Sequence, residues 1–150
     1  MTSAPLQTDQ QGLDVRSRFA TSKVNPRDVL LFPDGLPGYE TTKEFVLLDM
    51  PEQAPLKVLH AVNGSDTCFL VVDPKAVLPT YRCELGSSDR LRLGTDDDHT
   101  LVWLAIVIVS DNGEVAVNLR APIVINPARM TGRQVMPNAC VYPLRFVIGQ

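Results

Sequence analysis

The residues most able to do chemistry are the consecutive side chains of Asp96, Asp97, Asp98 and His99. Three carboxylates beside an imidazole could bind a cation or move a proton. Carboxylates adjacent in sequence converge only where a loop folds around an ion, and this stretch lacks the spaced glycine and distant glutamate of a calcium loop. Runs of charge usually face solvent. The pattern therefore favours a solvated loop over a metal or catalytic site.

His60 is the other residue whose type could support catalysis, and it lies within the apolar run of residues 56–62. A histidine base needs a nucleophile within hydrogen-bond reach, and no serine or cysteine motif points toward this one. The pattern favours a surface or hydrogen-bonded structural residue. We therefore expect a protein that is not an enzyme and has no catalytic residue, metal or cofactor. A hydrolase that uses Asp98 and His99 is the remaining catalytic alternative.

The stretch of residues 114–145 holds side-chain amides and prolines at fixed offsets between strand-like apolar runs. It contains no acid after Glu114, no pair of nucleophile and base, and no metal-ligand spacing. Amides and prolines at such positions serve recognition and strand termination. Binding to another protein is therefore the function that this stretch indicates. The residues concerned are Asn118, Ala121-Pro122, Asn126, Gly132-Arg133-Gln134 and Asn138.

A second candidate recognition segment is the loop of residues 33–39, with two prolines and two glycines in its first six positions. Proline removes backbone freedom where glycine permits unusual angles, so a tight, irregular loop is expected and not a flexible one. We expect Leu36, Pro37 and Tyr39 to present an apolar anchor to a partner, with the amides of Asn118 and Asn126 pairing with its exposed backbone. For the two asparagines, internal hydrogen bonds to neighbouring turns are an equal alternative.

The charges are divided unevenly along the 150 residues. The first 114 residues carry 10 basic and 17 acidic side chains, a net charge of −7, whereas the rest carries four arginines and no acid. An acidic chain with few aromatics suits a basic protein partner better than a phosphate backbone. A small barrel that binds single-stranded nucleic acid remains the alternative, and it would need a basic groove made from Arg129, Arg133, Arg145, Tyr142 and Phe146.

The three cysteines, Cys68, Cys83 and Cys140, are odd in number and widely spaced. This argues against a disulfide framework and against a zinc site. The apolar neighbours of Cys68 and Cys140 indicate small side chains packed in a core, which predicts a reducing, cytoplasmic setting. No run of about 18 apolar residues is present and the first 12 residues are polar, so neither a membrane span nor a secretory signal is expected.

Short apolar runs separated by turn residues predict an all-β, mainly antiparallel fold. The strong run at residues 101–109 is expected to be central and covered on both faces, and Asn112-Gly113 after it predicts a hairpin. One short helix is expected at residues 87–94, which have a serine cap and a closing glycine. Many short strands indicate a small barrel or sandwich with at most one or two short helices. The strands are predicted at residues 13–19, 29–32, 45–48, 56–62, 67–72, 101–109, 115–119, 123–125, 133–136 and 142–148.

These motifs, in this order, resemble the flagellar assembly factor family FliW. The likeness runs from about residue 19 to residue 148, and the asparagine-leucine-x-alanine-proline-isoleucine run is its most specific part. The family would place residues 13–150 in a single β-barrel domain behind a disordered tail at residues 1–12. The matching segments are FPDGLPGYE at 32–40, FVLL at 45–48, FLVVDP at 69–74, VNLRAPIVIN at 117–126 and GRQV at 132–135, with Tyr81 and Tyr142.

The resemblance implies a cytoplasmic bacterial protein that is a monomer when free and that binds flagellin. Members also bind the RNA-binding translational repressor CsrA and prevent it from silencing flagellin translation. When flagellin accumulates it occupies the factor and frees the repressor, so no catalytic step and no direct nucleic-acid contact are expected. The partner-binding residues that follow are Leu36, Pro37, Tyr39, Asn118, Asn126, Arg133 and Gln134.

Two departures from the family pattern concern the binding surface. Leu59-His60-Ala61 stands where relatives usually have leucine-glutamine-serine, which removes two polar groups that could face a partner. Pro137 stands where relatives usually continue a strand. Because proline cannot donate to a β-ladder, that strand is expected to end earlier or to lie at an edge.

Overall fold

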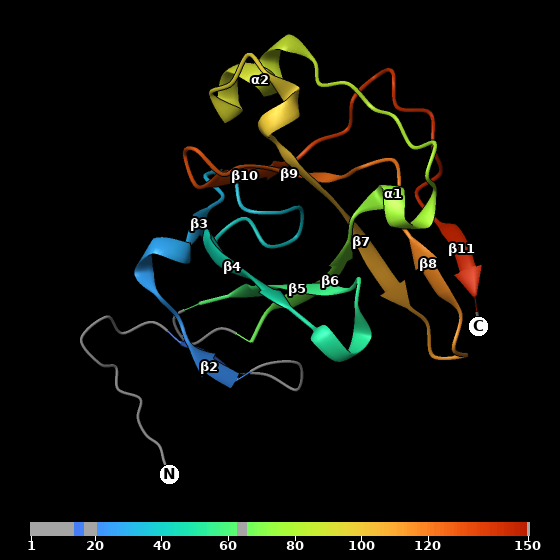
Figure 1. Cartoon of the computed structure of the whole chain (residues 1–150), viewed down its shortest axis with the longest axis horizontal. Coiled ribbons are helices and arrows are strands. Elements are labelled where there is room, and N and C mark those ends of the chain that lie inside the picture. Colours follow the sequence, from blue (N-terminus) through green and yellow to red (C-terminus); the bar gives the residue numbers. More distant parts are fainter. Residues whose placement is uncertain (1–13, 17–20, 63–65, 150) are drawn as a thin grey trace.

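The centre of the fold is a closed β-barrel of seven strands (Figure 1). Its strands are β3 (Leu30–Leu31), β4 (Glu44–Asp49), β5 (Lys57–Ala61), β6 (Cys68–Val72), β7 (Val102–Val109), β9 (Ile123–Asn126) and β10 (Thr131–Gln134). They follow the order β7-β6-β5-β4-β3-β10-β9, and a pairing of β7 with β9 closes the ring. Within this ring β3 and β10 run parallel and the other neighbours run antiparallel. The computed structural model describes residues 14–16, 21–62 and 66–149, so the tail predicted at residues 1–12 lies outside the described residues.

A two-stranded extension projects from β7 beyond the barrel. β8 (Val115–Val117) pairs with the end of β7, and β11 (Phe146–Gly149) pairs with β8. Separately, β1 (Asp14–Arg16) and β2 (Thr21–Lys23) pair antiparallel in a two-stranded sheet. The described helices are short: α1 (Pro74–Val77), α2 (Ser87–Leu93) and the 3-10 turns η1 (Pro26–Asp28), η2 (Pro51–Gln53) and η3 (Asp98–Thr100).

The all-β class, the antiparallel bias and the Asn112-Gly113 hairpin are confirmed. The predicted helix is α2, and Gly94 closes it with a left-handed φ of 72°. The sequence prediction missed α1, whose start is set by the Asp73 side chain accepting from the Lys75 N–H. Several strand limits also differ, since β10 is shifted toward the N-terminus and β11 toward the C-terminus. Both differ because residues 135–145 cover the barrel instead of extending its sheet.

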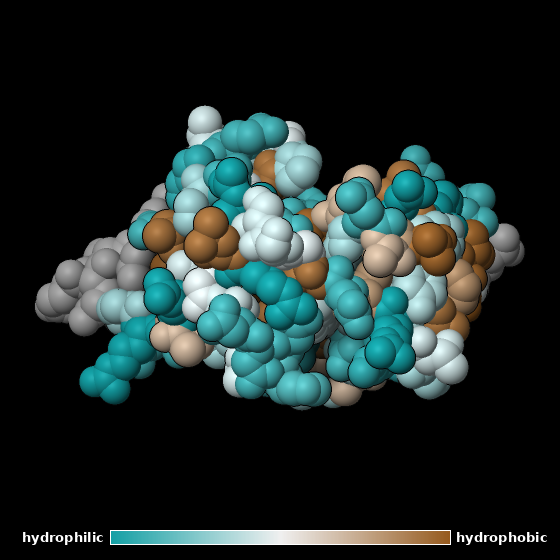
Figure 2. Space-filling model, turned by 90° about the horizontal axis from the view of Figure 1, so that it is seen from above, coloured by the Kyte–Doolittle hydropathy of each residue, from teal (hydrophilic) through white to brown (hydrophobic). Residues whose placement is uncertain are grey.

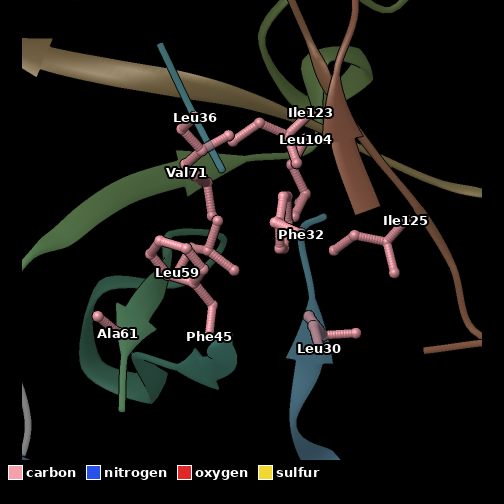
Figure 3. Packing of buried hydrophobic residues seen from close by; sticks show 10 residues of the cluster. All are labelled: Leu30, Phe32, Leu36, Phe45, Leu59, Ala61, Val71, Leu104, Ile123 and Ile125. Atoms are coloured by element: carbon pink, nitrogen blue, oxygen red, sulfur yellow. The ribbon is translucent and has the colours of Figure 1, made fainter. Parts of the chain in front are cut away.

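Apolar side chains from six of the barrel strands and from the loop after β3 fill the barrel interior (Figure 3). The rings of Phe32 and Phe45 meet edge to face, with centroids 5.2 Å apart. β10 supplies Gly132, where an added Cβ would lie 2.7 Å from the Phe32 ring. A glycine is therefore needed here to make room for the ring. The buried cluster consists of Leu30, Phe32, Leu36, Phe45, Leu59, Ala61, Val71, Leu104, Ile123 and Ile125.

The outer face of β7 is also covered, but along only part of its length. Trp103 packs in the cluster beneath α2, and Ala105 and Val107 pack in a third cluster with the segment around Tyr81. At the end of the strand Ile108 and Val109 are 43% and 56% exposed. The prediction of a central strand is confirmed, but the prediction that both of its faces are covered is wrong, because β7 runs past the barrel into the extension.

Cys83 and Cys140 form a disulfide across 57 residues of sequence. The prediction against a disulfide is therefore wrong, and the cysteines no longer support the inference of a reducing setting. The two cysteines belong to separate covering segments of the outer face, and their Cα atoms come within 5.2 Å only when both segments pack on β7 and β8. The spacing of the cysteines in the sequence does not show that these two segments pack together, so the disulfide could not be predicted from it.

Candidate partner-binding surfaces

The loop between β3 and β4 is held in one shape by two consecutive turns. The Gly35 N–H donates to the Phe32 carbonyl at 2.8 Å, and the Tyr39 N–H donates to the Leu36 carbonyl at 2.7 Å. The second turn has proline followed by glycine with φ of 86°, the pattern of a type II turn. At Gly35, with φ of 63°, an added Cβ would lie 2.6 Å from the backbone at Glu40. The predicted tight loop is confirmed.

The three residues predicted as the loop's apolar anchor divide between the core and the surface. Leu36 is 2% exposed and packs in the barrel interior, so its side chain supports the loop from below. Pro37 is exposed at the turn, and Tyr39 is 43% exposed. The Tyr39 ring stands edge-on against Phe69 of β6, with centroids 5.3 Å apart, which fixes its position. Pro37 and Tyr39 are thus the loop residues available to a partner.

Arg133 binds the loop to α2 instead of reaching into solvent. Its Nη1 lies 2.5 Å from the Asp34 carboxylate and its Nε lies 3.2 Å from Asp89 in the first turn of the helix. Arg92 adds a longer contact to Asp34 at 3.8 Å. The Arg133 side chain is 21% exposed. Its charge is therefore used to position the loop.

A bulge at residues 118–122 separates the barrel from the extension. Leu104 of β7 faces Ile123, and Val107 faces Val117, so three steps along β7 correspond to six along the partner strand. The chain segment that pairs with β7 is therefore interrupted by three extra residues. β9 on one side of this bulge closes the barrel, and β8 on the other side leads into the extension.

The predicted amides Asn118 and Gln134 hold this bulge together. The Asn118 Oδ1 accepts from the N–H groups of Arg120 and Ala121 at 3.1 and 3.0 Å. The Gln134 Nε2 donates to the Ala121 carbonyl at 2.9 Å. Both backbone groups of Ala121 are satisfied by these two side chains. In this structure Asn118 therefore makes hydrogen bonds within the fold, which was the alternative to contact with a partner.

Asn126 is likewise used inside the fold. It is 2% exposed, its Nδ2 donates to the Leu93 carbonyl at 2.7 Å, and its Oδ1 accepts from the Ala128 N–H at 3.1 Å. Asn126 thus satisfies a carbonyl near the end of α2 and shapes the turn after β9. The predicted amides of Asn118, Asn126 and Gln134 position the backbone and do not line one common surface.

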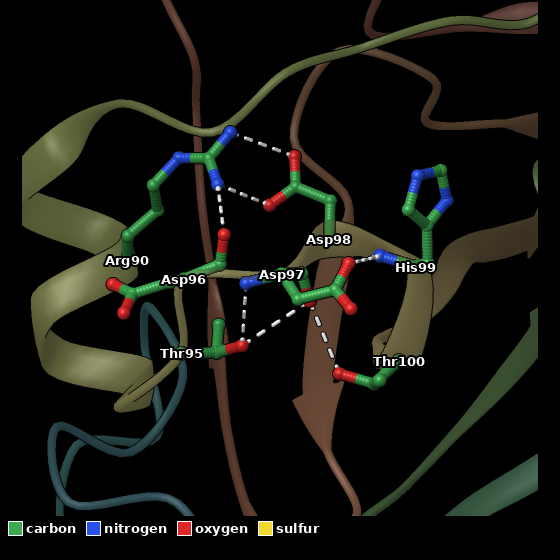
Figure 4. A network of polar contacts seen from close by, with 7 residues as sticks. All are labelled: Arg90, Thr95, Asp96, Asp97, Asp98, His99 and Thr100. Carbon is green, nitrogen blue, oxygen red and sulfur yellow. Dashed lines mark hydrogen bonds and ion pairs between the residues drawn. The ribbon is translucent and has the colours of Figure 1, made fainter.

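The acidic run before β7 is more ordered than a solvated loop (Figure 4). Asp97 caps η3 by accepting from the His99 N–H at 2.9 Å. Asp98 meets both terminal nitrogens of Arg90, at 2.7 and 2.9 Å. Asp96 and Asp97 are exposed as predicted, whereas the prediction of a solvated loop is wrong for Asp98. Its carboxylate ties η3 to α2. Among the described residues no set of histidine, cysteine and acidic side chains is arranged to hold a metal ion.

The departure at residues 59–61 does not alter the surface of this structure. His60 and Ala61 are both fully buried. The His60 Nδ1 donates to the Ala61 carbonyl at 2.6 Å, which is a structural contact. The other departure has the expected consequence, because β10 ends at Gln134, before the buried Pro137.

Exposed apolar side chains gather at the end of the molecule that carries β11, an area that sequence reasoning did not single out (Figure 2). Val147 of β11 faces Ala116 of β8, which faces Ile108 of β7, so these residues form one row across three strands. The sequence signal for this area was the run of consecutive apolar residues in the last strand. A strand at the end of a sheet can bury at most one face, so some of these side chains must be exposed. The C-terminal apolar surface comprises Ile108, Val109, Val141, Leu144, Val147 and Ile148, which are 43–84% exposed.

The basic groove required for nucleic-acid binding is not formed by the residues proposed for it. Arg133 pairs with two acids, and Arg145 pairs with Glu114. Tyr142 stacks on Tyr81 with centroids 4.6 Å apart, and Phe146 is partly buried in the outer cluster. Of that set Arg129 is exposed and makes no ion pair among the described residues, and one arginine without open aromatic faces beside it does not form a groove. Across the described ranges, no helix has the length and apolar character needed to cross a membrane.

Comparison with known proteins gives a consistent family. The model of the FliW protein family matches residues 14–148. The flagellar assembly factor FliW of Thermoanaerobacter pseudethanolicus is 33% identical over 132 residues, which cover 87% of this chain and 88% of that protein. The corresponding factor of Moorella thermoacetica is 34% identical over 131 residues, covering 86% and 83%. A crystal structure of the flagellar assembly factor FliW matches with a TM-score of 0.83 at 26% identity, over 93% of this chain and 98% of that one.

Proposed function

The chain belongs to the FliW family of flagellar assembly factors, and from this premise we propose that it acts by binding other proteins and not by catalysis. The proposed partners are flagellin and the translational repressor CsrA, in the bacterial cytoplasm. While flagellin is scarce, the protein holds CsrA and flagellin translation proceeds. When flagellin accumulates it displaces CsrA, which then represses translation. The switch requires only that binding of one partner weakens binding of the other.

The C-terminal apolar surface is the observation that most directly supports the proposal of protein binding. Four of its six side chains are at least half exposed: Val141, Leu144 and Val147 lie in residues 141–148, and Val109 lies on β7, on the other side of β8 from β11. Contiguous exposed apolar side chains mark protein interaction sites in soluble domains. We assign this surface to one of the two partners.

The loop of residues 33–39 is proposed as a second contact. Tyr39 is a rigid aromatic side chain, and Pro37 beside it has little conformational freedom to lose on binding. Leu36, Asn118, Asn126, Arg133 and Gln134 are proposed to act through the backbone shapes that they hold. The loop leans on β6 and α2, whereas the C-terminal apolar surface lies on the extension, so two partners can have separate footprints.

The test is isothermal titration calorimetry of this protein with purified flagellin and purified CsrA from the same bacterium. Tight binding of each, with flagellin displacing CsrA from the preformed complex, is the expected result. Failure of a folded sample to bind either protein would overturn the proposal. Binding of both without mutual displacement would retain the binding activity but remove the switch.

The assignment of the C-terminal apolar surface is tested with two variants, each of which replaces one exposed apolar side chain by a carboxylate. Val147→Asp lies in the C-terminal apolar surface, and Leu91→Asp lies on α2, where the leucine is 82% exposed. We expect Val147→Asp to weaken one partner about tenfold or more, because an unpaired carboxylate is desolvated at the interface. Leu91→Asp should bind both partners as the wild type does. Equal binding by the two variants would remove the C-terminal apolar surface from the proposal.

A further inference from the structure

The barrel wall opens where β6 leaves β7. β6 pairs with β7 through Leu70 to Val107, Val71 to Ile106 and Val72 to Ala105. Continuing this register would place Pro74 opposite Trp103. The chain turns away at that point, since Asp73 caps α1 and Pro74 begins it (Figure 1). The first half of β7 is therefore paired with β9 on one edge, and on the other edge no strand among the described residues pairs with it.

The backbone of Trp103 points to this open edge. The Ile106 carbonyl accepts from the Asn118 N–H, and just past the end of β7 the Ser110 N–H donates to the Glu114 carbonyl. The even-numbered residues along this strand therefore direct their backbone N–H and carbonyl groups toward β8 and β9. Successive strand residues alternate in direction, which turns the N–H and carbonyl of Trp103 the other way. Pro74 has no N–H to offer, and its carbonyl already accepts from Leu78 at 2.9 Å. Within the described residues, the backbone of Trp103 has no hydrogen-bond partner on that edge.

A cavity of about 500 Å³ lies along this edge. Leu101 and residues 102–104 of β7 line it, together with residues 73–75 and 81–83. Its volume is within the range of roughly 300–1,000 Å³ typical of binding sites. The cavity therefore provides room beside an unpaired strand edge, as an added strand requires.

Most of the charges that line this groove are already paired. Lys57 pairs with Asp49, Arg82 with Glu84 and Asp98 with Arg90. The Asp73 carboxylate accepts from the Lys75 backbone N–H. The ammonium group of Lys75 meets no acid in an ion pair among the described residues. An occupant that carries a carboxylate is thus favoured over a basic one.

We propose that this groove binds a short extended segment of a partner protein, which adds as a strand to the edge of β7 at Trp103 and directs an acidic side chain toward Lys75. The proposal rests on the proposed function in that the occupant is a protein. The open N–H and carbonyl of Trp103 supply the main-chain pairing, and Lys75 selects the acidic side chain.

The test selects ligands without assuming a partner. A phage-displayed library of random eight-residue peptides is panned on the full chain, and the best peptide is synthesised. Acidic peptides are expected, with binding about tenfold weaker in Lys75→Glu, since reversal turns attraction into repulsion. Arg27→Glu, the same reversal at an exposed residue of η1, should bind the peptide as the wild type does. Equal loss in both variants would reduce the effect to overall charge and overturn the assignment to the groove.

Strand addition has its own readout in amide hydrogen exchange followed by NMR. In the free protein the Trp103 amide should exchange faster than that of Leu104, which belongs to the ladder with β9. Saturating peptide should slow exchange at Trp103 about tenfold or more, and N-methylation of the central peptide amides should abolish that protection. Unchanged exchange at Trp103, or no peptide binding tighter than about 1 mM, would overturn the proposal.

The two proposals fail separately. If flagellin and CsrA bind in calorimetry but no peptide protects Trp103, the proposed function stands and the groove is not its site. If a peptide protects Trp103 while neither protein binds, the groove inference stands and the proposed partners are wrong.

Discussion

The loop of residues 33–39 and the bulge of residues 118–122 were both predicted to contact a partner, yet they use their side chains in opposite ways. The loop buries Leu36 beneath itself and leaves Tyr39 at the surface. The bulge turns its asparagine inward, where Asn118 caps two N–H groups of its own backbone. An irregular backbone can thus be stabilised by apolar packing, which leaves its surface side chains available to a partner. It can also be stabilised by hydrogen bonds from polar side chains, and those side chains are then not available to a partner.

The largest expected effect is at the loop and concerns Gly35. Gly35→Ala places a Cβ 2.6 Å from backbone atoms and demands a left-handed conformation. We expect a loss of about 3 kcal/mol or more in unfolding free energy, measured by urea denaturation. Gly38→Ala also has a left-handed φ but meets open space, so it should lose only about 1–2 kcal/mol. Equal losses would show that the close backbone approach does not hold the loop.

The next effect is at the bulge. Asn118→Ala leaves the N–H groups of Arg120 and Ala121 without their acceptor, and a loss of about 2 kcal/mol is expected in the same denaturation assay. Asn118→Asp keeps an oxygen in place and should retain most of the stability. If instead Asn118→Ala were as stable as the wild type but bound a partner poorly, Asn118 would return to the list of contact residues.

Tyr81 connects the bulge to the covering segments and gives a pH-dependent prediction. Its hydroxyl donates to the Leu119 carbonyl at 2.8 Å, so Tyr81→Phe should lose about 1 kcal/mol at neutral pH. Burial, with a smaller contribution from Tyr142, raises the pKa of Tyr81 from 10.0 to about 12. The folded state therefore holds this proton more tightly than the unfolded state.

The stability that Tyr81 contributes is complete below pH 10 and is lost as the pH rises through 12. Denaturation at a series of pH values should show a shallower decline above pH 10 for Tyr81→Phe than for the wild type. Parallel declines would mean that the hydroxyl is not protected by the fold.

The smallest effect on stability is expected at Tyr39. Tyr39→Ala loses an edge-on contact with Phe69 at a half-exposed site, worth about 0.5 kcal/mol, so the melting temperature should stay near the wild-type value. Partner binding should nevertheless weaken, and Tyr39→Phe, which keeps the ring, should restore most of it. A stability loss as large as that of Gly35→Ala would place Tyr39 with the structural residues.

Much of the fold follows from local signals in the chain. Short apolar runs between turn residues predicted the barrel strands, Asn112-Gly113 predicted the hairpin, and a serine-to-glycine stretch predicted α2. The family likeness was carried by short motifs such as the proline-glycine loop. These features are readable because they depend on neighbours within a few residues: side-chain alternation, turn angles and helix ends.

The candidate site was less predictable because it depends on which side of a backbone each residue faces after packing. Asn118, Asn126 and Gln134 have the residue types of a recognition surface, and only the positions of Ala121, Leu93 and Ala128 show that their amides are already used. The exposure of Val147 and Ile148 likewise results from β11, a strand placed outside the barrel.

The sequence by itself determined the strands, the turns and the family, because alternation and backbone preference act between near neighbours. Only the tertiary structure decided that Cys83 meets Cys140, that Arg133 binds Asp34 and Asp89, and that Pro74 leaves the edge of β7 at Trp103 open. Each of these depends on segments brought together by closure of the barrel, and the chain carries no local signal for contacts between distant residues.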